Sequence, residues 1–135
     1  MESVVWELAQ AQLSKGHAVR VVTLDRMFQS NCSARLPARE TVAGIETVRI
    51  PFFGSRRYPL AWSVRKHIKD ADVVHVHGLD FFFDYLASTW TLHRRRLVVS
   101  THGAYFHTPF AAALKRLYFS TVTRLSLSRY AGVVT

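Results

Sequence analysis

Two histidine–glycine pairs, 25 positions apart, are the residues of this sequence best suited to chemistry. His77-Gly78 ends the run Asp72–Gly78 (DVVHVHG), and His102-Gly103 ends the run Leu97–Gly103 (LVVSTHG). An imidazole donates and accepts hydrogen bonds and changes its charge near neutral pH, while a glycine beside it lets a ligand approach the backbone. The two pairs therefore predict a polar ligand-binding or catalytic site.

Both pairs end a run of β-branched apolar residues, which is typical of a strand buried on both faces of a parallel sheet. Open α/β sheets bind ligands in the crevice at the carboxyl ends of their strands. For His102 we favour a function over a structural hydrogen bond to a neighbouring carbonyl, because it lies at such a strand end. Gly103 would let a ligand approach closely, and the helix expected beyond it favours anions at its N-terminus.

His75 and His77 share one face of their strand, because alternate residues of a strand point the same way. Two interpretations stay open. Either His75 is a core residue and His77 lies near the crevice, or both rings hold a metal ion with Asp80 or His102 as a further ligand. We favour the first and assign no metal site. Asp80 in its simplest role caps the helix that follows.

Other motifs for nucleotides and nucleophiles are absent from the sequence. The glycines occur singly, at positions 16, 44, 54, 78, 103 and 132, so there is neither a G-x-G-x-x-G motif nor a Walker loop. No serine lies in a nucleophile elbow. A self-contained dinucleotide or ATP site is therefore not expected.

The elements that must position the histidines alternate as in a doubly wound, Rossmann-like parallel α/β sheet, which we expect to form one domain with one continuous core. We predict helices over 1–15, 60–69 and 80–93 and a last helix that begins at its N-cap Thr108. We predict strands over 18–24, 40–42, 45–51, 72–78 and 97–101 and a further strand from Gly132. The helix over 80–93 should bury Phe82 or Phe83, Leu86 and Trp90, and the last helix should bury Phe110, Leu114, Leu117, Thr121 and Leu125. Arg94–Arg96 should be a solvated helix end.

The charge balance points to an anionic partner, since 18 Lys and Arg face 9 Asp and Glu, for a net charge of +9. Phosphate-bearing ligands, nucleic acid and an anionic membrane all suit such a charge. Basic and aromatic residues alternate over 52–69, where we predict a loop over 52–59 and a membrane-surface site, with a solvated face as the alternative. Its proposed members are Arg56, Arg57, Trp62, Arg65 and Lys66.

Cysteine content and hydropathy indicate the cellular compartment of the protein. The single cysteine, Cys32, allows no disulfide framework and suits a reducing compartment. The first fifteen residues do not form a signal peptide, and the longest uncharged run, Leu97–Leu114, is too polar to span a membrane. We expect a cytoplasmic protein that is peripheral on the inner face of the cell membrane.

Taken in order, these segments resemble the N-terminal domain of glycosyltransferase family 4, the retaining nucleotide-sugar enzymes of GT-B fold. Met1–Ala9 is similar to the first helix after the family's glycine-rich loop, and Gly16–Val19 with the following apolar run is similar to its "GH-x-V" entry to the second strand. Asp72–His77 is similar to the fourth strand, and Ser100–Gly103 to the loop whose histidine faces the sugar and phosphate.

The resemblance implies the acceptor-binding half of a glycosyltransferase. His102 would orient the donor phosphate or sugar as the catalytic residue, and Gly103 would admit the substrate. Further substrate-binding residues on the acceptor side would be Glu2, His77, Gly78 and Asp80. The implied partners are a nucleotide-sugar donor, a glycan or lipid-linked acceptor and an anionic membrane surface, with no nucleic acid and no cofactor beyond the nucleotide-sugar as co-substrate.

The sequence also departs from the family pattern. It lacks the first strand with its Gly-Gly loop, and no two glutamates have the donor domain's spacing of seven intervening residues. We therefore expect a partial domain, without the nucleotide-sugar-binding domain and inactive alone. Two alternatives stay open: a stand-alone anion- or membrane-binding α/β module without catalysis, and a metal hydrolase that uses His75, His77 and His102.

The missing first strand leads to a structural expectation. It would lie between the strands over 18–24 and 73–77, so these two strands should either leave a gap or pair directly in a contracted sheet. In either case the isolated chain should aggregate through its exposed strand edges.

Overall fold

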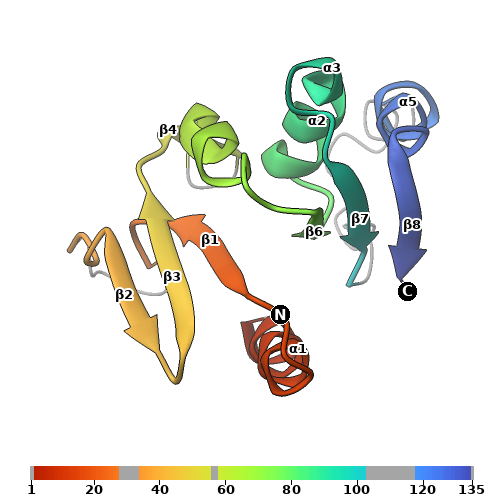
Figure 1. Ribbon diagram of the computed structural model, residues 1–135. Coiled ribbons are helices and arrows are strands. Elements are labelled where there is room, and N and C mark those ends of the chain that lie inside the picture. Colours follow the sequence, from red (N-terminus) through yellow and green to blue (C-terminus); the bar gives the residue numbers. More distant parts are fainter. Residues whose placement is uncertain (1, 28–33, 56–57, 103–117, 135) are drawn as a thin grey trace. The chain divides into compact units, whose positions relative to one another are not determined.

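The computed structural model describes residues 2–27, 34–55, 58–102 and 118–134. The chain divides into two compact units, Met1–His67 and Ile68–Thr135, each with its own three-stranded sheet (Figure 1). Both units combine helices with parallel strands, so the predicted Rossmann-like α/β class is confirmed. The parallel strands are distributed over two sheets, whereas the sequence predicted one sheet around one core.

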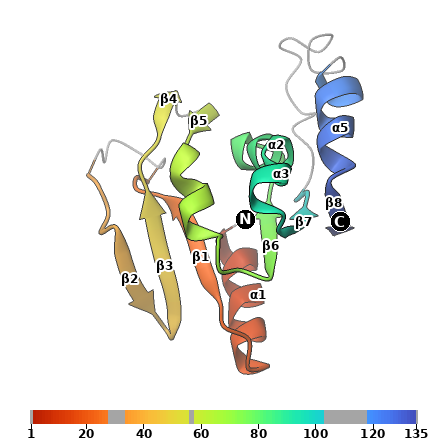
Figure 2. The same ribbon diagram turned by 45° about the horizontal axis from the view of Figure 1, so that its top comes forward.

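The first unit is built on a sheet of order β1-β3-β2. β1 (Arg20–Leu24) runs parallel to β3 (Ile45–Ile50), and β2 (Arg39–Val42) pairs with β3 in antiparallel direction. The helix α1 (Glu2–Ser14) lies next to this sheet (Figure 2), contacts β3 and buries Ala9. β3 supplies most of the buried side chains of its sheet, namely Ile45, Thr47, Val48 and Ile50.

A two-residue turn joins β2 to β3, as the split of this segment by Ala43-Gly44 predicts. Val42 pairs with Ile45, and φ is +45° at Ala43 and +82° at Gly44. Positive φ at both central residues is the mark of a type I′ turn, whose twist matches that of the flanking strands. The two predicted strands over 40–42 and 45–51 thus form a hairpin.

The loop predicted over 52–59 is wrong. β4 (Phe53–Ser55) and β5 (Tyr58–Leu60) form a separate antiparallel hairpin there. The sequence analysis assigned Phe53 and Tyr58 to a loop, but aromatic residues also favour strands. The helix predicted over 60–69 is a 3-10 helix, η1 (Trp62–His67), which buries Val64.

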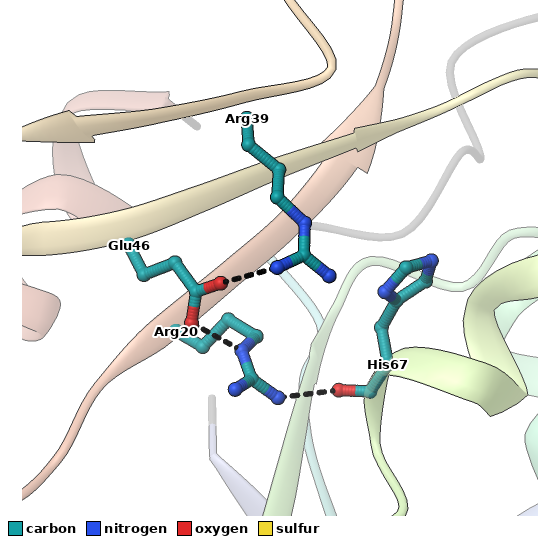
Figure 3. A network of polar contacts seen from close by, with 4 residues as sticks. All are labelled: Arg20, Arg39, Glu46 and His67. Atoms are coloured by element: carbon teal, nitrogen blue, oxygen red, sulfur yellow. Dashed lines mark hydrogen bonds and ion pairs between the residues drawn. The ribbon is translucent and has the colours of Figure 1, made fainter.

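A polar network ties the end of η1 to the sheet of the same unit (Figure 3). The Nη1 of Arg20 donates to the carbonyl of His67 at 3.1 Å, and its Nε lies 2.6 Å from Oε2 of Glu46. Arg39 approaches the other carboxylate oxygen at 3.6 Å. Burial lowers the pKa of His67, and the charges of Arg39, Arg20 and Lys66 lower it further against the opposing effect of Glu46.

The second unit holds a fully parallel sheet of order β6-β7-β8. Its strands are β6 (Val73–His77), β7 (Arg96–Ser100) and β8 (Tyr130–Val134). The central strand β7 is the most buried, with Leu97 and Val99 at 0% exposure on one face and Ser100 at 6% on the other, as predicted for a strand covered on both faces. β6 is an edge strand and Val73 is 52% exposed, so the same prediction is wrong for β6.

The helix predicted over 80–93 is divided into α2 (Phe81–Ser88) and α3 (Trp90–His93). Thr89 separates them, and its hydroxyl donates to the carbonyl of Tyr85 at 2.7 Å, which competes with the helical hydrogen-bond pattern. Phe83 and Leu86 are buried at 1% exposure as predicted, whereas Trp90 is only half-buried.

The buried face predicted for the last helix is wrong where it can be tested. Its described part is a π-helix, η2 (Phe119–Thr123), followed by α5 (Arg124–Leu127). Thr121 is exposed and Leu125 is 73% exposed, while Thr123 and Ser126 are buried. The wider π turn shifts the register that a regular 3.6-residue repeat assumes. The predicted cap Thr108 and the inward residues Phe110, Leu114 and Leu117 lie outside the described residues.

Both strands that were expected to flank a missing strand lie at sheet edges. β1 is paired only with β3 in the first sheet, and β6 is paired only with β7 in the second, within the described parts of the chain. β1 belongs to the first unit and β6 to the second, so the expected gap or direct pairing between them stays a prediction. No helix in the described ranges is long and apolar enough to cross a membrane.

The contact between α5 and α2 generates a stability prediction. Ser126 donates to Oδ1 of Asp84 at 2.7 Å, and Tyr118 donates to the other carboxylate oxygen. Replacing Ser126 with alanine removes a charge-assisted hydrogen bond in a partly buried place, so we expect Ser126→Ala to lower the free energy of unfolding by about 1–2 kcal/mol. Urea denaturation of the full-length protein measures this difference.

Ser128→Ala is the matched control for this experiment. Ser128 is exposed and its hydroxyl contacts only the local carbonyl of Leu125 among the described residues. Its loss should change the free energy of unfolding by less than about 0.5 kcal/mol. Equal effects of the two substitutions would contradict a stabilising role for the Ser126–Asp84 contact.

Candidate functional site

The carboxyl ends of β6 and β7 bring the pair His77-Gly78 together with His102. In the parallel register His77 is opposite Ser100, and the N–H of Gly78 donates to the carbonyl of Ser100 at 2.8 Å. His102 follows two residues after the end of β7, with φ of +46°. A positive φ is uncommon for a residue other than glycine and is often found at functional sites. The chain thus turns sharply where His102 leaves the strand.

Three imidazoles from these strand ends form a stack. The ring centroids of His75 and His77 lie 4.2 Å apart, and those of His77 and His102 lie 5.1 Å apart. Nδ1 of His77 and Nε2 of His102 are 2.8 Å apart, which is hydrogen-bond distance. The shared strand face predicted for His75 and His77 is confirmed, and the neighbouring strand adds His102 to it.

The first ring of the stack is fixed by a residue that the sequence analysis did not single out. Nε2 of His75 lies 2.8 Å from Oγ of Ser100, and Ser100 is buried at 6% exposure. The sequence did contain a signal for this contact, since Ser100 is a polar residue within the apolar run of β7. A side chain on one strand contacts side chains of the neighbouring strand on the same face of the sheet. Ser100 therefore orients the histidine stack from β7.

The environment of the stack disfavours protonation. Burial lowers the pKa of His77 to about 4, with additional contributions from proton charge on His75 and His102. Burial likewise lowers the pKa of His75, and positive charge on His102 lowers it further. His77 is therefore uncharged near neutral pH. The contact between His77 and His102 then needs one proton, carried by either of the two facing nitrogens.

This arrangement suits hydrogen bonding to a polar ligand more than metal binding. The His77–His102 contact occupies one nitrogen of each ring, so Nε2 of His77 and Nδ1 of His102 remain for other partners. Stacked rings do not converge on one point between them. Within the described residues, no group of three or more His, Cys, Asp and Glu side chains is arranged to hold a metal ion.

Asp80 caps α2, as its simplest interpretation predicts. Its Oδ1 accepts the N–H of Phe82 at 2.9 Å, which satisfies one of the free donors at the helix start. Burial raises the pKa of the Asp80 carboxyl, and the N–H groups of Phe82 and Phe83 partly oppose that rise. A direct contact between Asp80 and substrate stays a prediction.

The remaining predicted substrate residues are distributed more widely. Gly78 directly follows β6 with φ of +99°, a conformation that favours glycine. Glu2 begins α1 in the first unit. Gly103 lies outside the described residues, so the structure does not test its predicted approach to a ligand.

The described members of the predicted membrane surface belong to η1. Trp62 is 50% exposed, Lys66 is exposed and Arg65 is half-buried. Arg56 and Arg57 lie outside the described residues. The hairpin of β4 and β5 adds Phe53 at 67% exposure, an aromatic residue that the prediction did not include.

Comparison with known proteins connects the whole chain to one family and one group of relatives. The family model Glycosyltransferase Family 4 matches residues 1–135. A protein of Xanthomonas oryzae pv. oryzae (strain PXO99A), named GDP-mannose:cellobiosyl-diphosphopolyprenol alpha-mannosyltransferase, is 52% identical over 135 residues, which cover 99% of this chain and 35% of that protein. Proteins of the same name from Xanthomonas campestris and Komagataeibacter xylinus are 49% and 42% identical, each over 99% of this chain and 35% and 34% of their own length.

The chain thus spans about a third of the length of the curated relatives it matches. No solved structure matches it.

The depressed pKa of His77 generates a prediction about stability and pH. The unfolded chain protonates His77 near its ordinary pKa of 6.5, whereas the folded protein protonates it only near pH 4. The folded state is therefore favoured above pH 6.5, and this contribution is lost as the pH falls from about 6.5 to about 4. We expect His77→Gln to reduce the fall in urea midpoint over this range, measured on the full-length protein.

His17→Gln is the control, because His17 is exposed and lies outside the stack. This substitution should leave the dependence of the urea midpoint on pH close to that of the wild type. A His77→Gln variant with the wild-type dependence would show that His77 titrates normally.

Proposed function

We propose, because the chain belongs to Glycosyltransferase Family 4, that it is the acceptor-binding part of a retaining enzyme that transfers a sugar from a nucleotide-sugar to a lipid-linked acceptor. The observation that carries the proposal is the hydrogen-bonded pair His77–His102 at the carboxyl ends of parallel strands. This edge of an α/β sheet is where such folds bind ligands.

The names of the relatives indicate which donor and which acceptor we propose. Those proteins are named for GDP-mannose and for cellobiosyl-diphosphopolyprenol, so we assign a mannosyl donor and a diphosphate-linked lipid acceptor here as well. The same names give an alpha-linkage. GDP-mannose is itself α-linked at its phosphate, so an alpha-product means that the sugar keeps its configuration, as the retaining mechanism requires.

The histidine pair supports a specific division of labour. Uncharged His77 donates its Nδ1–H to Nε2 of His102 and so fixes the tautomer of that ring, which leaves the Nδ1–H of His102 to donate to a sugar hydroxyl or a phosphate oxygen. His102 is thus the group proposed to touch the substrate, and His77 is a positioning residue. In the transfer, the bond from the anomeric carbon to the phosphate oxygen breaks and a bond from that carbon to the acceptor oxygen forms. The nucleoside diphosphate leaves with the electron pair of the broken bond and takes up the proton that the acceptor hydroxyl loses.

The surface formed by β4, β5 and η1 supports a location at the membrane. Phe53, Tyr58 and Trp62 are exposed at 67%, 43% and 50%, and Lys66 is exposed beside them in sequence. Exposed rings near cations suit the interface of an anionic bilayer. A polyprenol tail keeps the acceptor in such a bilayer, so peripheral binding on its cytoplasmic side would bring the enzyme to its substrate.

Substitutions in the histidine pair test the proposed activity. In the full-length protein we expect His102→Ala to lower kcat for sugar transfer roughly 100-fold, the usual effect of losing a donor at the reacting charge. His77→Asn should lower kcat less and change its dependence on pH, because it acts through His102. Transfer is measured with radiolabelled GDP-mannose and a diphosphopolyprenol-linked acceptor.

The exposed His17 again provides the control, and His17→Ala should keep wild-type kinetics. If His102→Ala kept the kcat and KM of the wild type for donor and acceptor, the assignment of His102 would be wrong. Absence of any sugar transfer by the wild-type protein would favour the alternative, a binding module without catalysis.

Vesicle binding tests the membrane surface separately. Replacing Arg56, Arg57, Arg65 and Lys66 by glutamine should strongly reduce binding to phosphatidylglycerol vesicles, since each cation near such a surface contributes about 1 kcal/mol. Salt should weaken the wild-type binding, because surface attraction is screened over about 8 Å at physiological ionic strength. Flotation of the full-length protein measures both effects, with Lys15→Gln as the control. Equal binding to neutral vesicles would instead favour a merely solvated face.

A further inference from the structure

A pocket of about 370 Å³ opens in the second unit where β7 and β8 begin. Figure 1 shows α3 and α5 beside these strand starts. Four of the nine lining residues are arginines and none is acidic. The residues that carry the argument are Trp90, Arg94, Arg95, Arg96 and Arg129.

The chain builds this pocket with a sharp turn after α3. Arg94 has φ of +51°, a left-handed conformation in which glycine is usual at a helix end, and its N–H donates to the carbonyl of Trp90 at 2.7 Å. Nδ1 of His93 accepts the N–H of Arg95 at 3.0 Å, and Nε2 of the same ring lies 2.9 Å from the carbonyl of Leu86. One imidazole thus fixes the turn that presents three successive arginines.

The cations of the pocket lack carboxylate partners in the described part of the chain, where no ion pair involves any of the four arginines. The guanidinium of Arg129 lies 5.5 Å from the ring centroid of Trp90, a cation–π contact that leaves its charge unneutralised. Arg95 is half-buried and donates through Nη2 to the carbonyl of Lys69, while its buried Nε has no hydrogen-bond acceptor among the described residues. Arg95 is therefore not the freely solvated helix end that the sequence suggested.

We propose that this pocket binds a phosphate group. Like charges gathered around one concave site repel each other, and an anion within the pocket would remove that repulsion. Arginine forks match phosphate oxygens in two-point hydrogen bonds, and several such forks suit a doubly charged group. The buried Nε of Arg95 is a donor that still requires an acceptor.

The proposed site goes beyond sugar transfer. Arg96 begins β7 and Ser100 ends it, so the arginine pocket and the histidine stack lie at opposite ends of the same strand. The phosphate can belong to a lipid headgroup or to a soluble phosphate ester, because both present the same oxygens. The experiments below distinguish these two sources.

Titration of the full-length protein with inorganic phosphate tests the site directly. The nuclear magnetic resonance signal of the indole N–H of Trp90 reports binding within the pocket. This signal is assigned by its loss in the variant Trp90→Phe. We expect Arg96→Gln and Arg129→Gln each to weaken the phosphate affinity measured from this signal at least tenfold. Arg124→Gln is the matched control, since Arg124 is an exposed cation on α5 that does not line the pocket.

Arg94→Gly separates loss of charge from loss of folding. Glycine adopts the positive φ of this position more easily than arginine, so the thermal midpoint should stay the same or rise. Phosphate affinity should nevertheless fall, because one cation is removed. A fall in affinity with an unchanged or higher midpoint cannot come from unfolding and would support the proposal.

Vesicles identify the source of the phosphate. One outcome is that the protein binds phosphatidylglycerol vesicles more strongly than phosphatidylcholine vesicles, and that this preference falls in Arg96→Gln and Arg129→Gln but not in Arg124→Gln. That outcome would support the proposal with a lipid headgroup as the ligand. A response of Trp90 to inorganic phosphate with the same dependence on these variants would support it with a soluble ligand. If neither probe distinguishes the pocket variants from Arg124→Gln, the proposal is overturned.

Discussion

The parallel pairing of β6 with β7 is the interaction on which the candidate site depends. Its register sets His77 opposite Ser100, so the residues that follow each strand emerge at the same edge of the sheet. A shift of one residue would turn His75 and His77 to the other face of β6 and separate them from Ser100 and His102. The buried Leu97 and Val99 of β7 hold this register, because a shifted strand would expose them.

The side chains at the two ends of β7 differ in how far they are buried. At the carboxyl end burial keeps His77 uncharged, so an imidazole pair serves as a set of oriented donors and acceptors without fixed charge. At the amino end the arginines are mostly accessible, and only Arg95 is partly enclosed. One strand therefore separates a neutral hydrogen-bonding site from a strongly cationic one.

The sequence was sufficient for the family, the α/β class and the meeting of His77 with His102, because each follows from local runs and from the rule that parallel strands end at one edge. It was not sufficient for the inward face of the last helix, where Leu125 is exposed. Helical periodicity assumes a constant turn, and nothing in the sequence marked the π turn. Nor did it reveal the pocket at Arg94–Arg96, because a run of cations is usually solvated and only the left-handed turn at Arg94 makes these three line a concavity.

The π turn over Phe119–Thr123 gives the unit a tolerance of chain length that composition does not show. A π turn holds roughly one more residue than an α turn, and each residue of an α-helix rotates the chain by about 100°. Deleting one residue from this segment would therefore convert the π turn into a regular α turn and leave Ser126 facing Asp84. A deletion within a regular helix has no such outlet, because it rotates every residue beyond it by about 100°.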